Sequence, residues 1–158
     1  MKVLITGGAG FIGSHLAEEL LKGGNYVSVI DNLSTGSMDN ITHLKQNPKF
    51  SCVIDTIMDA KIMRKLISGC DVIYHLAAAV GVKYIIDNPL LSIETNIKGT
   101  EIVLELANEL GKKKVLIAST SEIYGKDRPG RPSFKEDDDR LLGSTTISRW
   151  SYSCTKAV

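Results

Sequence analysis

The sequence has little cysteine, almost no net charge and no long apolar stretch at its N-terminus, and each absence excludes a class of protein. Its three cysteines, Cys52, Cys70 and Cys154, are scattered and lack a Cys-x-x-Cys spacing, which argues against a disulfide framework or a metal site and favours a cytoplasmic location. The net charge of +1 gives no field that would attract nucleic acid or an anionic membrane. The apolar run at Val3–Ile5 is too short for a signal-peptide core or a membrane span.

What the sequence does contain is an alternation of short apolar runs with helical stretches. Its 158 residues and 43% hydrophobic content suit one soluble domain, which we expect to occupy 1–158. The runs of strand length lie at Val3–Ile5, Tyr26–Ile30, Ser51–Ile54, Asp71–Tyr74 and Lys114–Ala118. Such alternation predicts an α/β fold, a doubly wound Rossmann-type parallel sheet with helices on both faces.

Three helices are predicted between these runs. Apolar residues recur with helical spacing in Phe11–Lys22, and glycines follow that segment. A second helix is expected from about Ala60 to Ile67, and a longer one from Pro89 to Leu110, where proline is a favoured first residue. From Gly125 to Ser148 the periodicity is lost, which predicts a long surface loop.

A glycine-rich turn connects the first predicted strand to the first helix. Gly7 permits a tight turn, Gly10 lets the backbone approach a diphosphate, and Gly13 lets the helix pack close to the strand. The positive end of the helix would then face the diphosphate. Asp31, at the end of the second strand, can accept hydrogen bonds from ribose hydroxyls and repel a 2′-phosphate. The sequence therefore predicts a dinucleotide site that prefers NAD to NADP.

A second constellation follows the fifth predicted strand. Tyr152 and Lys156 are one helical turn apart, so both side chains lie on one helix face. The pKa of a free tyrosine is about 10, and the lysine ammonium together with oxidised nicotinamide would lower it. Tyr152 could then take a proton from a substrate hydroxyl that Thr120 holds in line. Taken alone, a Tyr-x-x-x-Lys pair is common on surface helices. Its position after a strand of the predicted Rossmann-type sheet favours a catalytic pair.

The whole chain resembles the extended short-chain dehydrogenases/reductases, the NAD-dependent epimerase/dehydratase family. The resemblance rests on Thr6-Gly-Gly-Ala-Gly-Phe-Ile-Gly13, on Asn96-x-x-Gly-Thr and on the Ser/Thr, Tyr and Lys triad. It implies cofactor contacts from Gly7, Gly10, Phe11, Ile12, Gly13, Asp31, Asn32, Ser34, Asp55, Thr56, Leu76, Ala77, Ala78, Lys83, Asn96, Tyr152 and Lys156. Lys156 would also anchor the nicotinamide ribose. Asn96 by itself could equally be a polar residue satisfied inside a helix, and we expect His75 to be structural.

The branch of the family is indicated by the residues around the triad. Glu122, which follows Thr120 and Ser121, and the Arg149-Trp150 pair look like UDP-glucuronate decarboxylases and related uronate 4-epimerases. This resemblance implies a UDP-sugar substrate oxidised to a 4-keto intermediate, with Thr120, Ser121, Glu122, Tyr152 and Lys156 as catalytic residues. A UDP-glucose 4-epimerase is the alternative. A dehydratase ranks third, because that family usually has an acidic residue where Ser121 stands.

The resemblance also implies that the catalytic helix and a substrate-binding region should continue past Val158. We therefore expect an intact parent that pairs as a homodimer through the long helix near Glu94–Leu110 and the tyrosine helix. A further hypothesis is that the 158 residues alone bind NAD without catalysing a reaction, because a helix that ends near Lys156 is too short to be stable by itself.

Overall fold

The computed structural model describes residues 1–127, 130, 133–148 and 150–158. Contacts divide the chain into two compact units. Unit 1 comprises Met1–Ala78 and Lys98–Ala118, and unit 2 comprises Ala79–Ile97 and Ser119–Val158. Each unit has its own candidate functional residues.

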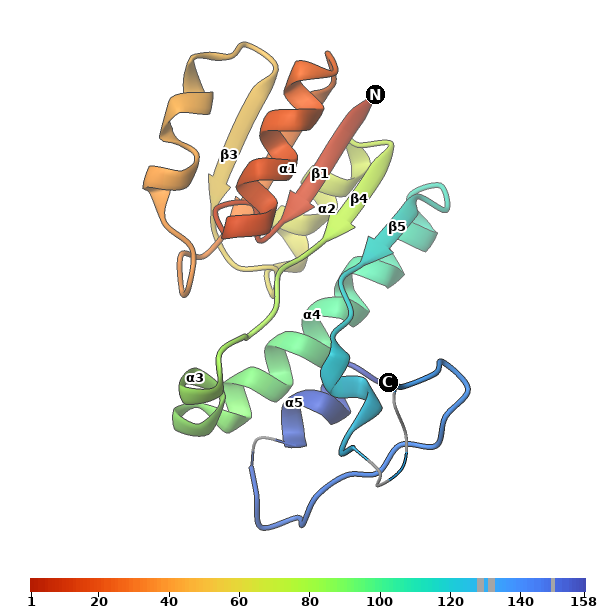
Figure 1. Cartoon of the computed structure of the whole chain (residues 1–158). Coiled ribbons are helices and arrows are strands. Elements are labelled where there is room, and N and C mark those ends of the chain that lie inside the picture. Colours follow the sequence, from red (N-terminus) through yellow and green to blue (C-terminus); the bar gives the residue numbers. More distant parts are fainter. Residues whose placement is uncertain (128–129, 131–132, 149) are drawn as a thin grey trace. The chain divides into compact units, whose positions relative to one another are not determined.

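Unit 1 contains a parallel sheet of five strands in the order β3-β2-β1-β4-β5 (Figure 1). The strands are β1 (Lys2–Thr6), β2 (Tyr26–Asp31), β3 (Phe50–Ile54), β4 (Val72–His75) and β5 (Lys114–Ile117). The chain runs outward from β1 to β3 and then returns to place β4 on the other side of β1. In sheets of this kind, ligands bind at the carboxyl ends of the strands where the order reverses, which here is the edge beyond β1 and β4.

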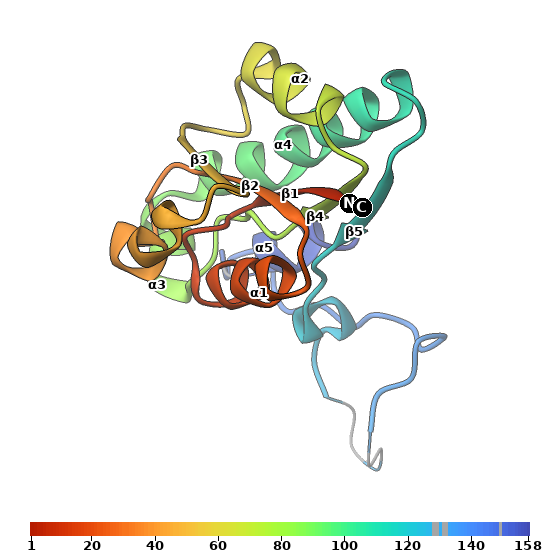
Figure 2. The ribbon, with the colours of Figure 1, turned by 90° about the horizontal axis from the view of Figure 1, so that it is seen from above.

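Helices cover both faces of this sheet, as predicted (Figure 2). Helix α1 (Phe11–Lys22) lies on one face, and α2 (Ala60–Ser68) lies on the other together with the Lys98–Glu109 part of α4 (Pro89–Glu109). Two apolar cores result, because the strands bury side chains on both sides. Val3, Ile5 and Val29 pack toward α1, whereas Leu4, Ile30 and Ile73 pack toward α2 and α4.

The structure contains short helices that the apolar periodicity did not indicate. These helices are most of the difference between the predicted and the observed elements. Unit 1 contains the 3₁₀ helices η1 (Met38–Asn40) and η2 (Thr42–Gln46). Unit 2 contains α3 (Val82–Asp87), η3 (Ser121–Tyr124) and α5 (Trp150–Thr155), and the first part of α4. A segment of one or two turns shows too few repeats of the helical period to be recognised in a sequence.

The predicted loop after Gly125 has little regular structure among its described residues. Its one bridge to another strand-like segment pairs Gly125 with Leu141. The amide of Lys126 also donates to the carbonyl of Leu141 at 2.7 Å. The backbone around Leu141 is thus attached to the residues that follow η3.

Candidate active site

The glycine turn of unit 1 is packed so closely that side chains would not fit. Gly7 has a φ of +72°, and a Cβ there would lie 2.8 Å from the amide nitrogen of Ala77. A Cβ on Gly13 would collide with the carbonyl oxygen of Gly7 and lie 2.8 Å from the Cα of Gly8. The roles predicted for Gly7 and Gly13, a tight turn and close packing of helix on strand, agree with this geometry.

The same turn presents the N-terminus of α1. Gly10 caps the helix with an extended backbone, and no side chain caps it. The side chains of Phe11 and Ile12 are 78% and 68% exposed. Because the first amides of an α-helix have no partner within the helix, those of Phe11, Ile12 and Gly13 can donate to an anion. The turn can therefore receive a diphosphate through its backbone.

Asp31 is held in place at the end of β2 by two backbone amides. One carboxylate oxygen accepts from Ala9 at 2.9 Å and the other from Leu33 at 2.8 Å. The residue is only 9% exposed. Sequence reasoning predicted the carboxylate as a ribose acceptor and missed that it also ties the glycine turn to β2. Each carboxylate oxygen retains a further lone pair for a hydroxyl donor.

The other predicted cofactor residues of unit 1 also follow strands of the sheet. Asn32 and Ser34 are exposed after β2, where the Asn32 side chain accepts from the amide of Ser34 at 3.1 Å. Asp55 and Thr56 follow β3, and both are half-buried. Leu76, Ala77 and Ala78 follow β4 and are half-buried too. All of them are thus at carboxyl ends of parallel strands, which is the edge where such folds bind nucleotides.

His75 lies inside unit 1 with both ring nitrogens hydrogen-bonded. Nδ1 is 2.8 Å from the hydroxyl of Thr6 and Nε2 is 3.1 Å from that of Thr100. The Thr6 hydroxyl in turn accepts from the amide of Ala77 at 3.1 Å. His75 is 1% exposed, so it connects β1, β4 and α4 internally. This agrees with the structural role predicted for it.

The catalytic candidates lie in unit 2. The side chain of Thr120 is hydrogen-bonded to the Tyr152 phenol. Thr120 also caps η3, because its hydroxyl accepts from the amide of Glu122 at 3.3 Å. Thr120, Glu122 and Tyr152 are all half-buried. The structure thus brings Tyr152 together with Thr120 and Glu122, which lie about 30 positions earlier in the sequence.

The pKa of Tyr152 does not shift in the direction that the sequence suggested. Burial raises the pKa of the phenol above its usual value, and the negative charge of Glu122 raises it further, while the Thr120 hydrogen bond lowers it. Among the described residues, Lys156 is not one of the causes of this shift, and the lowering expected from Lys156 together with oxidised nicotinamide stays a prediction. Burial disfavours the phenolate more than the Thr120 hydrogen bond favours it.

Glu122→Gln should lower the pKa of Tyr152. The substitution removes a negative charge that disfavours the phenolate and keeps the size of the side chain. Ultraviolet titration of tyrosinate, with Tyr152→Phe as the reference that isolates this residue among the five tyrosines, measures the change. A pKa of Tyr152 that stays unchanged or rises in Glu122→Gln would show that Glu122 does not act on the phenol.

Lys156 lies just past the last residue of α5, although its amide still donates to the carbonyl of Tyr152 at 3.1 Å. The two side chains are therefore one helical turn apart, as predicted. Burial lowers the pKa of the Lys156 ammonium. An ammonium can donate to a hydroxyl such as that of a ribose.

Asn96 supports α5 from the long helix. Its side-chain oxygen accepts from the amide of Ala79 at 2.8 Å, and its Nδ2 donates to the Thr155 hydroxyl at 3.1 Å. The Thr155 hydroxyl itself donates to the carbonyl of Tyr152 at 2.9 Å. Asn96 is 4% exposed and thus joins three segments of unit 2. Asn96 is thus hydrogen-bonded inside unit 2 and connects the long helix to the tyrosine helix, while its contact with a cofactor stays a prediction.

The remaining predicted residues of unit 2 are less enclosed. Ser121 is exposed at the first position of η3, and Lys83 is exposed on α3. Trp150 begins α5, with the Lys126 ammonium 6.0 Å from its ring centroid. Arg149, the other half of the predicted Arg-Trp pair, lies outside the described residues.

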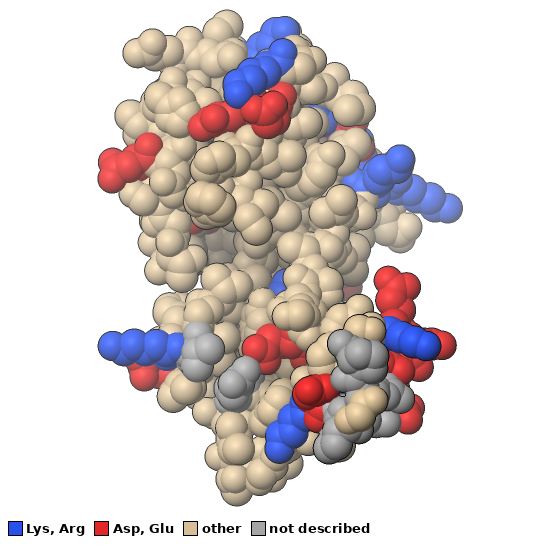
Figure 3. All heavy atoms as spheres, in the orientation of Figure 1, with Lys and Arg blue, Asp and Glu red and all other residues tan. Residues whose placement is uncertain are grey.

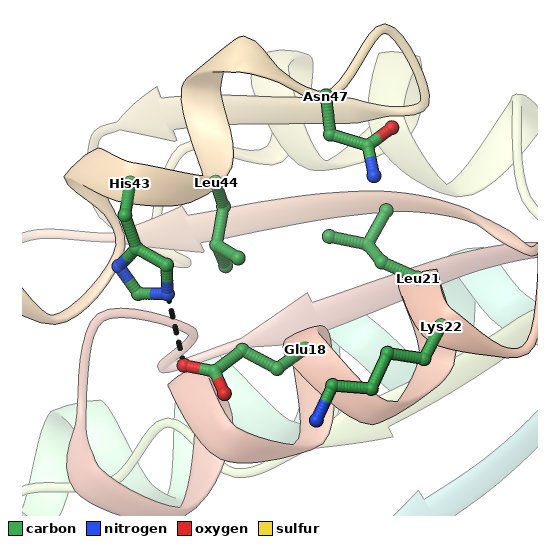
Figure 4. A pocket seen from close by; sticks show the side chains of 6 residues that line it. All are labelled: Glu18, Leu21, Lys22, His43, Leu44 and Asn47. Carbon is green, nitrogen blue, oxygen red and sulfur yellow. Dashed lines mark hydrogen bonds and ion pairs between the residues drawn. The ribbon is translucent and has the colours of Figure 1, made fainter.

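A hollow of about 270 Å³ lies elsewhere in unit 1, between α1 and η2 (Figure 4). Its lining consists of Glu18, Leu21, Lys22, His43, Leu44 and Asn47. His43 Nε2 is 2.9 Å from a carboxylate oxygen of Glu18, the contact dashed in Figure 4. The α1 residues that line this hollow lie in the second half of the helix, whereas the glycine turn precedes the first half. No predicted site residue lines the hollow.

The surface and the side-chain clusters give no sign of a different kind of site. Charges of both signs are interspersed among the described residues on the face shown in Figure 3. The described residues include no group of His, Cys, Asp and Glu side chains that could hold a metal ion. Within that same part of the chain, no helix is long and apolar enough to cross a membrane.

Comparison with known proteins gives a family match and several relatives. Residues 4–158 match the model of the GDP-mannose 4,6 dehydratase family. The chain is 48% identical over 157 residues to a UDP-N-acetyl-alpha-D-glucosaminuronate decarboxylase of Bacillus cytotoxicus, covering 99% of the chain and 47% of that protein. It is 39% identical over 125 residues to UDP-glucuronic acid decarboxylase 1 of Arabidopsis thaliana, covering 79% of the chain and 27% of the relative.

A solved structure shares the fold. The dTDP-glucose 4,6-dehydratase DesIV of Streptomyces venezuelae, crystallised with NAD, superposes with a TM-score of 0.85 at 34% identity, covering 99% of the chain and 48% of that protein. The Rossmann-type architecture predicted from the sequence is thereby confirmed. The chain spans about half the length of the first of these relatives and of this structure.

Proposed function

The chain belongs to the GDP-mannose 4,6 dehydratase family, as its resemblance to NAD-dependent epimerases and dehydratases predicted, and we propose that it is the NAD-binding part of an enzyme that decarboxylates a UDP-linked uronate. The observation that carries this proposal is the Thr120, Glu122 and Tyr152 arrangement of unit 2. The 48% identity to a UDP-N-acetyl-alpha-D-glucosaminuronate decarboxylase over nearly the whole chain supports decarboxylation.

The glycine turn of unit 1 fits NAD. Side chains at Gly7 and Gly13 would fill the space where the turn packs, and the free amides of α1 and the carboxylate of Asp31 offer donors to a diphosphate and acceptors to a ribose. Bound NAD would supply a reversible hydride acceptor for the sugar. Asn32, Ser34, Asp55, Thr56 and Leu76–Ala78 are proposed to line the nucleotide in unit 1, and Lys83, Asn96 and Lys156 are proposed contacts from unit 2.

NAD should bind at least about tenfold more tightly than NADP. A 2′-phosphate would meet the carboxylate of Asp31, which two backbone amides hold in place, and like charges repel. Calorimetric titration of the protein with each dinucleotide measures the ratio. Equal affinity for NAD and NADP would show that Asp31 does not discriminate between their riboses. The absence of heat with both dinucleotides at millimolar concentration would reject the proposed dinucleotide site.

Tyr152 is the proposed base. Its phenolate can take the proton of the sugar 4-hydroxyl, and the Thr120 side chain, which interacts with the Tyr152 side chain, can hold that hydroxyl. Because the chain's own residues raise the pKa of Tyr152, the phenolate depends on a positive charge brought by the cofactor. Proton transfer is thus coupled to cofactor occupancy.

Oxidation at the sugar 4-position makes a uronate into a β-keto acid. Such an acid loses its carboxylate as carbon dioxide because the ketone accepts the electron pair of the broken carbon–carbon bond, and a proton then replaces the carboxylate. Glu122 is proposed to act next to this centre, with Ser121 as a contact to the substrate. Neither role requires a metal ion.

Product analysis tests the reaction. The protein is incubated with NAD and either UDP-glucuronate or its N-acetylated amino-sugar analogue, and carbon dioxide and nucleotide sugars are measured. Carbon dioxide release supports decarboxylation, whereas a uronate epimer without carbon dioxide supports the 4-epimerase alternative. Inertness of both uronates alongside conversion of UDP-glucose would overturn both uronate proposals. NAD binding without any conversion would leave the hypothesis of a non-catalytic binding chain.

We also propose that two copies pair through α4. Leu90, Ile97 and Leu104 recur at intervals of seven residues on this helix, with Ile93 between them, and all four side chains are exposed by 36% to 68%. An apolar stripe of this spacing on one helix suits a helical partner. The Glu94–Leu110 segment predicted from the sequence contains two of the four.

Ile97→Glu combined with Leu104→Glu should convert a dimer into a monomer. Burying a carboxylate at the centre of an apolar helix interface is strongly unfavourable, so dissociation should be complete at micromolar protein. Sedimentation velocity reads the result. Lys98→Gln, a change at an exposed position of the same helix about 100° around the axis from Ile97, should leave the dimer intact. A wild-type protein that sediments as a monomer would reject the interface.

A further inference from the structure

Arg140 connects the two catalytic segments of unit 2. Its Nε donates to the carbonyl of Ile123 at 2.6 Å, in η3 next to Glu122. Its Nη2 donates to the carbonyl of Ser153 at 3.1 Å and to the Ser153 hydroxyl at 3.0 Å, in α5 next to Tyr152. One planar guanidinium thus donates from two adjacent nitrogens to neighbours of both catalytic side chains.

Ser153 completes the connection from the other side. Its hydroxyl donates to the carbonyl of Glu122 at 2.6 Å, and the residue is fully buried. Arg140, Ser153 and the carbonyls of Glu122 and Ile123 therefore form one hydrogen-bonded cluster, which we term the clasp. Arg140 is exposed, but its two bonds to Ser153 are partly buried, and hydrogen bonds from a charged donor are stronger than neutral ones.

The backbone beside Arg140 is itself attached to η3. Leu141 pairs with Gly125, and its carbonyl accepts from the amide of Lys126 at 2.7 Å. Gly125 has a φ of +77°, and a Cβ there would collide with the carbonyl of Leu141. The backbone that carries the Arg140 guanidinium is therefore fixed to the end of η3, and the guanidinium reaches α5 from there.

Helix α5 needs such support because it has only six residues. A helix this short is unstable in water without tertiary contacts. Asn96 holds its C-terminal end through Thr155, and the clasp holds its middle through Ser153. We infer that Arg140 is a positioning residue, which fixes the Tyr152 phenol against Thr120 and Glu122. The expected effect on catalysis rests on the proposed function, whereas the contacts of Arg140 rest on the geometry alone.

Kinetics of four variants test the inference. Arg140→Met should lower kcat at least about tenfold with KM and NAD affinity within about twofold of wild type, because misplacing a catalytic group slows the reaction more than it weakens binding. Arg140→Lys should recover part of the loss, since one ammonium can donate to one carbonyl but cannot span both. Ser153→Ala should also lower kcat, and Arg140→Met with Ser153→Ala should be no worse than Arg140→Met alone, because both remove the same cluster.

The matched control is Arg64→Met. Arg64 also makes two bonds from one guanidinium, at 2.6 and 2.7 Å to Glu109, on the surface of unit 1. Its loss should leave kcat unchanged. The inference is overturned if Arg140→Met retains a kcat within twofold of wild type, or if the substitution raises KM instead of lowering kcat. It is also overturned if Arg140→Lys has the wild-type kcat while Arg140→Met does not, because a positive charge alone would then be sufficient. If Arg140→Met does not fold, the kcat of Ser153→Ala tests the inference in its place.

A second readout separates this inference from the proposed function. Trp150 is the only tryptophan and begins α5, so quenching of its fluorescence by acrylamide reports whether the helix stays packed, with or without turnover. Quenching should rise at least about twofold in Arg140→Met and stay unchanged in Arg64→Met. If the wild-type protein converts no nucleotide sugar, raised quenching in Arg140→Met keeps the clasp while the proposed function fails. Unchanged quenching rejects the clasp in either case.

Discussion

Tyr152→Phe is expected to lower turnover of the nucleotide sugar at least about a hundredfold, because positioned proton transfer contributes about 10²–10⁴ to a rate. The phenyl ring keeps the packing of the half-buried side chain and removes only the hydroxyl that bonds Thr120. NAD affinity should fall less than the rate, since the glycine turn and Asp31, the proposed contacts of the diphosphate and the ribose, are unchanged. Steady-state rates with calorimetry on the same samples provide the measurement.

The control for this substitution is Tyr26→Phe. Tyr26 is 55% exposed at the start of β2, at the opposite end of that strand from Asp31, and its ring lies under the Lys49 ammonium at 5.5 Å. Loss of its hydroxyl should leave the rate unchanged. If Tyr152→Phe retains more than a tenth of the wild-type rate, Tyr152 is not the base, and another group must take the proton.

Gly13→Ala is expected to weaken NAD binding at least about tenfold and to destabilise the fold by about 1–3 kcal/mol, the usual cost of overpacking. The new methyl group would collide with the carbonyl oxygen of Gly7 and press on the Cα of Gly8, both of which are backbone. Because neither atom can rotate away, α1 must move off the strand and its amides lose their place. Chemical denaturation and calorimetric titration with NAD measure the two effects.

Gly69→Ala is the matched control for the glycine turn. This residue caps α2 with a φ of −88°, and a Cβ there would find its nearest neighbour at 3.6 Å, an ordinary contact. The substitution should leave both stability and NAD affinity near wild type. An equal loss in Gly69→Ala and Gly13→Ala would mean that the effect is a general one on the fold and that the turn has no special role.

The structural features that the sequence predicted correctly are those that depend on local spacing. Helix α1 starts and ends where its apolar pattern and flanking glycines predict, at Phe11 and Lys22. Each predicted strand differs from the observed one by no more than a residue at either end. The glycine turn was identified because its three glycines follow a strand and open a helix, a context contained in fewer than ten consecutive residues.

The residues that it missed act on partners far along the chain. Asp31 was predicted as a ribose acceptor, but its bond to Ala9 depends on β2 lying next to the turn after β1. Arg140 lies in the segment predicted as a long surface loop, and its bonds to Ile123 and Ser153 depend on how the loop after Gly125 returns to η3. The loss of periodicity in a sequence does not reveal which residue of a loop folds back.

The pKa of Tyr152 illustrates the same division most clearly. The sequence by itself determined that Tyr152 and Lys156 are one turn apart, because helical spacing is a local property. It also determined the fold class and the edge at which a nucleotide can bind, since apolar periodicity and glycine spacing are local as well. Only the tertiary structure decided that burial and Glu122 raise the pKa of the phenol, because desolvation and Coulomb energy depend on distances through space between residues about 30 positions apart.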